Sequence, residues 1–323
     1  MARTCTRVFS WAWRLCCVMP LGCGGSVDST GGALDAAAKT VGDAAVTPSG
    51  SGEPTAGAAG HVNGHGGSNA RAGSNATAGS GGAGAISMRW TPRPGTSWQW
   101  QLSGTLDTSF EVDVYDIDLF EISPAQLDAL HAQARKVICY FDTAYEPGRP
   151  DAGTLQPYRG NPIDGWPGQY WLDTREKTVA DVMIARIELA KNKGCDGLEA
   201  DDVDARSNDP GFPITANNQQ AFIKLLAEAA HARGLAFGLK NDLEEIPQLL
   251  ASVDFAINEQ CFEYDECDAL TPFITAGKPV FQVEYAEGSF DTKAAEICPK
   301  ANTRNFDTLI KHLELDPPRR ACR

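Results

Sequence analysis

Five short apolar runs in this sequence end in carboxylate or amide residues. They are Val112–Phe120, Cys195–Asp204, Ala236–Asp242, Phe255–Cys261 and Val280–Tyr285. An unpaired carboxylate inside a core costs several kcal/mol, so a buried strand is expected to be apolar along its length. Polar residues at the ends of several such strands therefore indicate one site at one rim of a sheet. In (β/α)8 barrels, the carboxyl-terminal rim holds the catalytic residues.

Strand-like and helix-like segments alternate in the second part of the chain. The predicted strands are Trp98–Leu102, Val112–Leu119, Lys136–Phe141, Gly197–Val203, Ala236–Lys240, Phe255–Glu259, Val280–Glu284 and Phe306–Ile310. This alternation favours βαβ units and a parallel sheet. Residues 88–323 have about the usual length of a single barrel, so the sequence predicts an α/β fold of the (β/α)8 TIM-barrel type.

Three helices have recognisable boundaries. They are Pro124–Ala134, Val179–Lys193 and Ala216–Arg233. Ser123, Thr178 and Thr215 directly precede them and are expected to cap their first turns. Gly234 is expected to end the last of the three.

The first 23 residues have the features of an export signal. Three arginines supply positive charge, and residues 8–21 are mostly apolar. Leu21-Gly22-Cys23 is similar to a bacterial lipoprotein processing site in which Cys23 receives the lipid. Plain secretion with an unmodified Cys23 is the alternative.

Residues 24–87 are mainly Gly, Ala, Ser, Thr and Asn. Such a segment cannot bury enough apolar surface to offset the entropy lost on ordering, so it is predicted to be a flexible linker. Together, the two segments predict an extracellular or cell-surface protein, expected to be a monomer. Lipidation of Cys23 would make it an outer-membrane lipoprotein.

Six cysteines remain after the predicted signal, an even number that allows disulfides in an exported domain. The sequence predicts the pairs Cys261–Cys267 and Cys298–Cys322. Cys139 and Cys195 lie inside or beside apolar strands and are interpreted as buried thiols. No CxxC pair is present and His is scarce, so neither a metal nor another cofactor is expected.

The formal net charge of −14 has two interpretations. It serves solubility alone, or it marks an acidic cleft for a cationic substrate. No basic stripe is visible in the sequence, so nucleic acid is not an expected partner.

Carboxylates at neighbouring strand ends suggest a reaction. Residues two apart on a strand share a face, so Asp116 lies with Asp118, and Glu199 with Asp201. Glu259 ends a strand two along and is the natural partner of Asp201. Facing carboxylates are what glycoside hydrolysis requires, one as nucleophile or base and the other as acid.

Three neighbours of this group have open roles. Lys240 is either a structural ion-pair partner of Asp201 or Glu199, or it lowers the pKa of the nucleophile. Asp202 and Asp204 are turn formers or, with Asp201, part of a metal cluster, although the run lacks the spacing of a Ca²⁺ loop. Glu259 follows apolar residues, and this setting is expected to raise its pKa, as suits an acid.

The connection Asp142–Lys177 is unusually long, and loops of this length are usually functional. It carries five aromatic residues, Tyr145, Tyr158, Trp166, Tyr170 and Trp171. They either stack on sugar rings above the barrel mouth or simply pack the loop onto the barrel.

The folded part resembles glycoside hydrolase family 114, the endo-α-1,4-polygalactosaminidases. The resemblance rests on WQWQLSG at 98–104, VYDIDLF at 114–120, RKVICYF at 135–141, KGCDGLEADDVD at 193–204, GFPITA at 211–216, GLKND at 238–242, NEQC at 258–261 and VFQVEY at 280–285. It implies a barrel that cleaves α-1,4-linked galactosamine polymers with retention, with Asp201 as nucleophile and Glu259 as acid/base. The family's E-P-D-N is E-A-D-D here, and Asp142 replaces its serine. Both changes are expected to add negative charge near the cleft, which suits a cationic galactosamine-containing polysaccharide.

The other polar and aromatic residues of these motifs are candidate substrate-binding residues. They are Trp98, Asp116, Asp118, Tyr140, Glu199, Lys240, Asn241, Asp242, Gln260, Glu284 and Tyr285. The alternative function is an inactive barrel that binds polysaccharide. Retention of both Asp201 and Glu259 favours the enzyme, because a binding module does not need a facing carboxylate pair.

Overall fold

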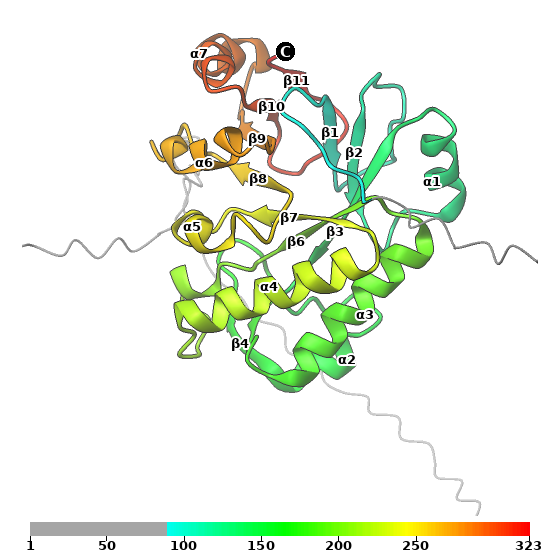
Figure 1. The fold of residues 1–323 in the computed structure, drawn as a ribbon, viewed down its shortest axis with the longest axis vertical. Helices are drawn as coiled ribbons and strands as arrows, with labels where there is room; N and C mark the ends of the chain where they lie inside the picture. Colours follow the sequence, from blue (N-terminus) through cyan, green and yellow to red (C-terminus); the bar gives the residue numbers. More distant parts are fainter. Residues whose placement is uncertain (1–88) are drawn as a thin grey trace, which may run out of the picture. The chain divides into compact units, whose positions relative to one another are not determined.

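The computed structural model describes residues 89–323. Eight parallel strands form a curled sheet in the order β1-β2-β3-β6-β7-β8-β9-β10 (Figure 1). Their bounds are β1 Trp98–Gln101, β2 Val114–Asp118, β3 Lys136–Asp142, β6 Gly197–Asp201, β7 Ala236–Lys240, β8 Phe255–Glu259, β9 Val280–Tyr285 and β10 Asp307–Lys311. All eight strands predicted from the sequence are confirmed. The predicted signal, Cys23 and the linker lie outside the described residues.

The helices lie on the outside of the curled sheet (Figure 1). They are α1 Pro124–His131, α2 Ala152–Leu155, α3 Lys177–Lys193, α4 Ala216–Ala232, α5 Ile246–Leu249, α6 Thr271–Thr275 and α7 Phe290–Thr303. The three predicted helices correspond to α1, α3 and α4; the boundaries of the others, including α7 with its internal Pro299, were not predicted. No helix among residues 89–323 is long and apolar enough to cross a membrane.

Two of the three predicted helix caps are confirmed. Ser123 and Thr215 each accept a hydrogen bond from a backbone N–H of their helix in a capping box. Thr178 was the wrong choice for α3, because that helix begins at Lys177, two residues before the predicted start, and Glu176 precedes it. The Thr178 hydroxyl instead accepts a hydrogen bond from Tyr158, 3.1 Å away, and so ties the helix to the long connection before it.

Apolar side chains fill the lower part of the barrel. Trp98, Phe255 and Phe281 pack together inside the sheet. The Phe281 ring centroid lies 4.9 Å from that of Trp98 and 5.6 Å from that of Phe255. Gly238 leaves room for this packing, since a Cβ there would lie 2.3 Å from the Phe255 ring. The larger apolar core lies between the outer face of the strands and the helices.

The C-terminal segment joins the first and last parallel strands. Its short strand β11, Arg320–Ala321, pairs antiparallel with β10. On the other side, the Leu315 carbonyl accepts from Leu102 N at 3.0 Å, and the Arg319 guanidinium donates to the Trp98 carbonyl at 2.5 Å. The segment therefore occupies the seam between β1 and β10.

Three disulfides link the described cysteines. Cys261–Cys267 and Cys298–Cys322 confirm the predicted pairs. The interpretation of Cys139 and Cys195 as thiols was wrong, because they form a third disulfide. The two cysteines are 56 residues apart in the chain, but β3 and β6 are neighbours in the sheet and bring the sulfurs together.

The long connection after β3 forms a structure of its own. The strands β4, Arg159–Pro162, and β5, Tyr170–Leu172, make a small antiparallel sheet. At its base, Arg186 of α3 binds Asp142 at 3.1 Å and Asp151 at 2.5 Å. Asp142 is buried in this ion network and does not line the cavity described below. Its negative charge still contributes to raising the pKa of Tyr140 and Asp202, which line the cavity, so the expectation of added negative charge near the cleft is supported despite the guanidinium beside it.

Candidate active site

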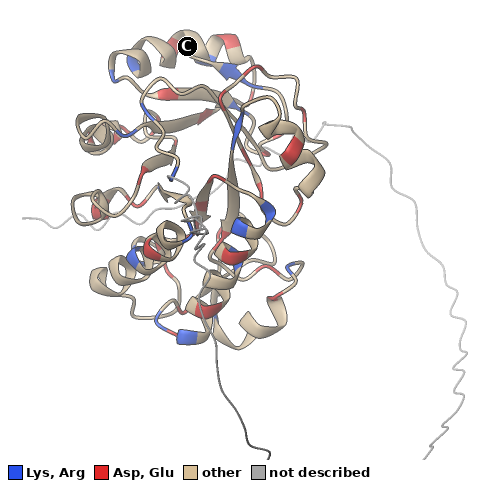
Figure 2. Cartoon of the chain, turned by 45° about the vertical axis from the view of Figure 1, so that its right-hand side comes forward, with Lys and Arg blue, Asp and Glu red and all other residues tan. Residues whose placement is uncertain are grey.

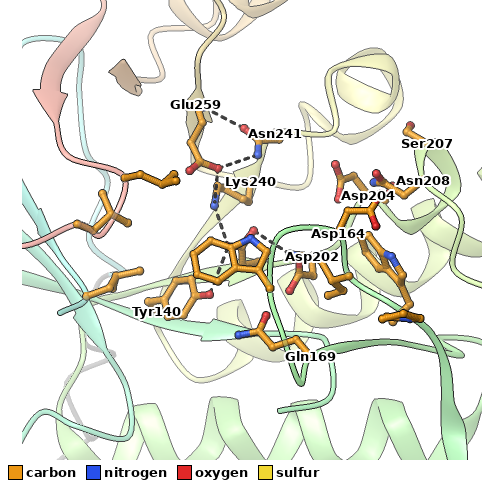
Figure 3. A pocket seen from close by; sticks show the side chains of 18 of the residues that line it. Tyr140, Asp164, Gln169, Asp202, Asp204, Ser207, Asn208, Lys240, Asn241 and Glu259 are labelled. Carbon is orange, nitrogen blue, oxygen red and sulfur yellow. Dashed lines mark hydrogen bonds and ion pairs between the residues drawn. The ribbon is translucent and has the colours of Figure 1, made fainter. Parts of the chain in front are cut away.

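A cavity of about 720 Å³ opens at the carboxyl ends of the strands (Figure 3). The last residues of β6, β7, β8 and β9 line it: Asp201, Lys240, Glu259 and Tyr285. Tyr140 of β3 and Trp100 of β1 contribute further side chains. The site predicted from polar strand ends thus lies where parallel strands bring those ends together.

Lys240 lies at the centre of the charged groups in this cavity. Its ammonium nitrogen is 2.9 Å from Asp201 Oδ2, 3.0 Å from Glu259 Oε2 and 3.3 Å from Glu199 Oε1. The ring of Trp100 lies 5.0 Å from the same nitrogen. The side chain is only 3% exposed, so these contacts replace water as its solvation. A single ammonium therefore holds two facing carboxylates and a third beneath them.

Asp201 is fixed by groups on both of its oxygens. The Tyr140 hydroxyl donates to Oδ2 at 3.3 Å, and the backbone N–H of Asp202 donates to Oδ1 at 2.8 Å. Asp202 has a φ of 57°, so the chain turns sharply directly after the strand. This turn points the Asp202 amide back at the preceding carboxylate.

Glu259 is held as an anion. The Tyr285 hydroxyl donates to Oε1, and Asn241 Nδ2 donates to Oε2 at 3.1 Å. Burial by itself favours the neutral acid, but the attraction of Lys240 and these hydrogen bonds outweigh it and lower the pKa of Glu259. The expectation of a raised pKa was wrong, because the apolar residues before Glu259 are not what surrounds its carboxyl group.

Asp116 and Glu199 lie beneath the cavity and do not line it. Both are completely buried, and their carboxyl groups interact with each other. Burial, followed by the neighbouring Glu199, raises the pKa of Asp116 well above its ordinary value. Burial likewise raises the pKa of Glu199 to about 7, against the opposing attraction of Lys240.

One wall of the cavity is acidic. Asp164, Asp202, Asp204 and Asp209 line it together with the polar residues Asn161, Gln169, Ser207 and Asn208 (Figure 3). Burial raises the pKa of Asp204 to about 6. Across the whole domain, acidic and basic residues are interspersed over helices and loops (Figure 2). Among residues 89–323, no group of three or more His, Cys, Asp or Glu side chains is arranged to hold a metal ion.

Two of the five aromatic residues of the long connection line the cavity. Trp166 is 49% exposed at its edge, and Trp171 is buried in its wall. Tyr145 and Tyr170 instead pack against each other and the Arg159 guanidinium. Trp166 and Trp171 are therefore placed at the cavity, whereas Tyr145 and Tyr170 pack the connection together.

Besides Asp116 and Glu199, five further predicted substrate-binding residues do not line the cavity. They are Trp98, Asp118, Asp242, Gln260 and Glu284. Trp98 is buried in the barrel and donates to the Asp307 carbonyl at 2.7 Å, and Asp118 pairs with Arg149 at 2.8 Å. Asp242 accepts from Gln219 at 2.8 Å, and Glu284 from the Phe262 amide at 3.0 Å. Gln260 is buried directly after Glu259, with a φ of 59°.

Several residues that line the cavity were not predicted. Asn161, Asp164 and Gln169 lie on the long connection, where loop length was the only signal. Leu313 and Leu315 lie on the C-terminal segment and also line the cavity. Nothing in their sequence pattern indicates this position, which depends on how the chain closes the sheet.

Replacement of Lys240 by methionine should destabilise the fold. It would leave three carboxylates in mutual contact without a counter-charge, and breaking a buried ion pair in this way costs about 3–5 kcal/mol. Denaturant unfolding at neutral pH measures this directly. The control is Lys191→Met on the exposed face of α3, which should change little. Equal stability of Lys240→Met and the wild type would show that Lys240 carries no net stabilising charge.

Comparison with known proteins identifies a family and two similar structures. The model of glycoside-hydrolase family GH114 matches residues 82–323. The crystal structure of Aspergillus fumigatus Ega3 in complex with galactosamine is 38% identical, has a TM-score of 0.69, and is matched over 73% of this chain and 98% of Ega3. The glycoside hydrolase domain of PelA from Pseudomonas aeruginosa shares the fold at 12% identity and a TM-score of 0.57, over 70% of this chain and 98% of that domain. Comparison with curated protein sequences gave no match.

Proposed function

Because the chain belongs to glycoside-hydrolase family GH114 and is a glycosidase, we propose that it cleaves α-1,4-linked galactosamine-rich polysaccharide with retention. Asp201 is the proposed nucleophile and Glu259 the proposed acid/base. The observation that carries the proposal is the ammonium of Lys240, which two facing carboxylates share at the floor of the cavity.

The geometry of the two carboxylates supports retention. One nitrogen lies 2.9 Å from Asp201 Oδ2 and 3.0 Å from Glu259 Oε2. The two oxygens therefore lie within about 6 Å of each other, nearer the roughly 5–5.5 Å spacing of retaining glycosidases than the roughly 6.5–9.5 Å of inverting ones.

The proposed reaction has two steps. In the first, Asp201 Oδ attacks the anomeric carbon while Glu259 protonates the leaving oxygen, which gives a glycosyl-enzyme ester. In the second, Glu259 removes a proton from water, and that water displaces Asp201 with the original configuration restored. Tyr140 and the Asp202 amide keep the Asp201 carboxylate in position for the attack.

The walls of the cavity suit a cationic polymer. The acidic residues Asp164, Asp204 and Asp209 attract the ammonium groups of galactosamine. Trp166 offers an exposed ring on which a sugar can pack. The similar protein Ega3 was crystallised with galactosamine, which fits this class of substrate.

The proposed setting is outside the cell. We infer secretion or anchoring at the cell surface, with Cys23 as the lipidated residue of an outer-membrane lipoprotein. A galactosamine-rich polymer in a biofilm matrix is the proposed partner, and nucleic acid is not. The proposed enzyme acts as a monomer.

Release of reducing sugar from purified polygalactosamine tests the function. We expect release from this polymer, with cellulose and poly-N-acetylglucosamine as negative controls. Proton NMR of the first products should show the α anomer before mutarotation. If the protein bound polygalactosamine and released nothing, it would be a polysaccharide-binding barrel instead.

Chemical N-acetylation of the polymer should weaken cleavage. The acetyl groups remove the positive charges that the acidic wall attracts, and we expect kcat/KM to fall about tenfold, or about 1.4 kcal/mol. Initial rates on matched polymer lengths measure this. High salt should reduce kcat/KM for the amine polymer but not for the acetylated one, because screening acts on the charged pair. A higher kcat/KM for the acetylated polymer would contradict electrostatic recognition.

A further inference from the structure

The side chain of Asn241 takes the place of a backbone carbonyl at the end of the ladder between β7 and β8. The Asn241 N–H donates to the Ile257 carbonyl at 2.9 Å, as parallel pairing requires. The next bond of such a ladder would run from the Glu259 N–H to the Asn241 carbonyl. The Glu259 N–H donates instead to the side-chain oxygen Oδ1 of Asn241, at 3.0 Å.

A left-handed turn directly after β7 makes this exchange possible. Asn241 and Asp242 have φ angles of 46° and 44°, a conformation that Asn and Asp tolerate better than other residues with a side chain. Because the chain turns here, the Asn241 carbonyl leaves the ladder and the side chain replaces it. Backbone held in such a conformation often marks a functional site.

The same side chain also holds the carboxylate of Glu259. Asn241 Nδ2 donates to Glu259 Oε2 at 3.1 Å. The orientation of the amide is fixed, because Oδ1 faces a backbone N–H, which can only donate. Asn258 Nδ2 donates to the same Oδ1 at 3.4 Å. All three side-chain hydrogen bonds of Asn241 therefore go to β8, and one side chain links the backbone of Glu259 to its own carboxyl group.

The two oxygens of the Glu259 carboxylate have different partners. Oε2 accepts from Asn241 and from the Lys240 ammonium at 3.0 Å, and neither of these nitrogens can accept a hydrogen bond. Among the described residues, Oε1 has one partner, the Tyr285 hydroxyl, which can both donate and accept. Each carboxylate oxygen has two lone pairs. Only Oε1 therefore keeps a free position for the proton that a general acid must carry.

Resting on the proposed function, we propose that Asn241 is a positioning residue for Glu259 that, together with Lys240, selects Oε1 as the oxygen that carries the catalytic proton. In the first step, Oε1–H gives its proton to the glycosidic oxygen while the bond from that oxygen to the anomeric carbon breaks and Asp201 forms the ester. In the second step, Oε1 takes a proton from the attacking water. Asn241 acts through Glu259 and contacts no substrate.

Asn241→Gly is the informative deletion, because glycine adopts a positive φ without strain. We compare kcat/KM at the pH optimum of each variant. On polygalactosamine, whose leaving sugar needs a proton, it should fall about 100-fold. On an aryl galactosaminide with an activated leaving group, it should stay within about threefold of the wild type, because ester formation then needs little acid. An equal loss on both substrates would overturn the positioning role.

A control variant separates this effect from lost stability. Asn241→Gly leaves the Glu259 N–H without its acceptor, so its melting temperature should fall. Asp254→Ala removes the acceptor of the Phe237 N–H, 3.0 Å away, near the amino-terminal end of the same two strands. It should also lower the melting temperature, but it should keep the wild-type ratio of kcat/KM on the two substrates. A similar change of this ratio in Asp254→Ala would assign the effect to lost stability and overturn the proposal.

Binding distinguishes a positioning residue from a substrate-binding one. In the Asp201→Asn background, calorimetry with a short galactosamine oligomer should give Kd values that differ by less than about threefold with and without Asn241→Gly. A larger loss of affinity would make Asn241 a substrate-binding residue. A crystal structure of Asp201→Asn with the same oligomer should place the glycosidic oxygen beside the Glu259 oxygen that accepts from Tyr285. Contact with the oxygen that faces Lys240 would overturn the selection of Oε1.

The hold of Asn241 on the carboxylate can also be measured without turnover. In a carbon NMR titration of the free enzyme, the pKa of Glu259 should rise in Asn241→Gly, because a donor to the anion is lost. The other charged and titratable groups around this carboxyl remain in the variant: Glu199, Asp201, Asp204, Lys240, Tyr264 and Tyr285. An unchanged pKa would overturn the proposal. This measurement decides the role of Asn241 even if the wild type cleaved no galactosamine polymer and the proposed function failed.

Discussion

Asp201→Asn should lower kcat/KM on polygalactosamine by about three orders of magnitude or more. The amide cannot form the ester that a retaining mechanism requires, so the loss should affect every substrate, including those with activated leaving groups. The fold should survive the change. The one carbonyl oxygen of asparagine can still accept from the Asp202 amide, and Lys240 keeps Glu259 and Glu199 as counter-charges.

Initial rates and a trapped intermediate measure this effect. A fluorinated galactosaminide should label the wild type at Asp201, as read by peptide mass spectrometry, and should leave Asp201→Asn unlabelled. Asp181→Asn, an exposed change on α3, is the matched control and should keep wild-type rates. Near-wild-type activity of Asp201→Asn, or label on another carboxylate, would mean that the nucleophile lies elsewhere.

The strands and the centre of the site could be predicted because they depend on local pattern. Each barrel strand is an apolar run, and its polar last residue is visible in sequence, as at Asp201, Lys240 and Glu259. Parallel pairing then brings those last residues to one rim of the barrel, independently of the length and sequence of the loops. The position of Lys240 near Asp201 follows from the adjacency of β6 and β7 alone.

Other features depend on contacts between distant segments and have no local signal. The Cys139–Cys195 disulfide needs β3 and β6 to be neighbours although the two cysteines are separated by 56 positions in the sequence. The low pKa of Glu259 depends on Lys240 and Asn241 at the end of β7 and on Tyr285 at the end of β9, all of them outside its own strand. The apolar residues beside Glu259 in sequence were therefore a poor guide to its environment.

Pattern alone also could not separate residues that line the cavity from those that support it. Asp116 and Asp118 share a strand, but Asp116 interacts with the buried Glu199, whereas Asp118 pairs with Arg149. Asp142 departs from the family pattern and pairs with Arg186 outside the cavity. In each case, a basic or protonated partner from another segment decides the role.

Glu259→Ala should discriminate between substrates by their leaving groups. On polygalactosamine, whose leaving sugar needs a proton, kcat/KM should fall by about two to four orders of magnitude. On an aryl galactosaminide with an activated leaving group, the first step needs little acid, so ester formation should stay fast and the ester should accumulate. The expected time course is a rapid initial release of aryl alcohol followed by slow steady-state turnover. Glu228→Ala on the exposed side of α4 is the control.

Azide should then restore turnover of Glu259→Ala on the activated substrate. Removal of the side chain opens space beside the ester, and a small anion needs no general base to attack it. Because azide would displace Asp201 from the face that water normally uses, the product should be the α-galactosaminyl azide, as read by NMR. A β-azide would indicate direct displacement on an inverting enzyme. No rescue, together with equal losses on both substrates, would assign Glu259 to binding rather than to proton transfer.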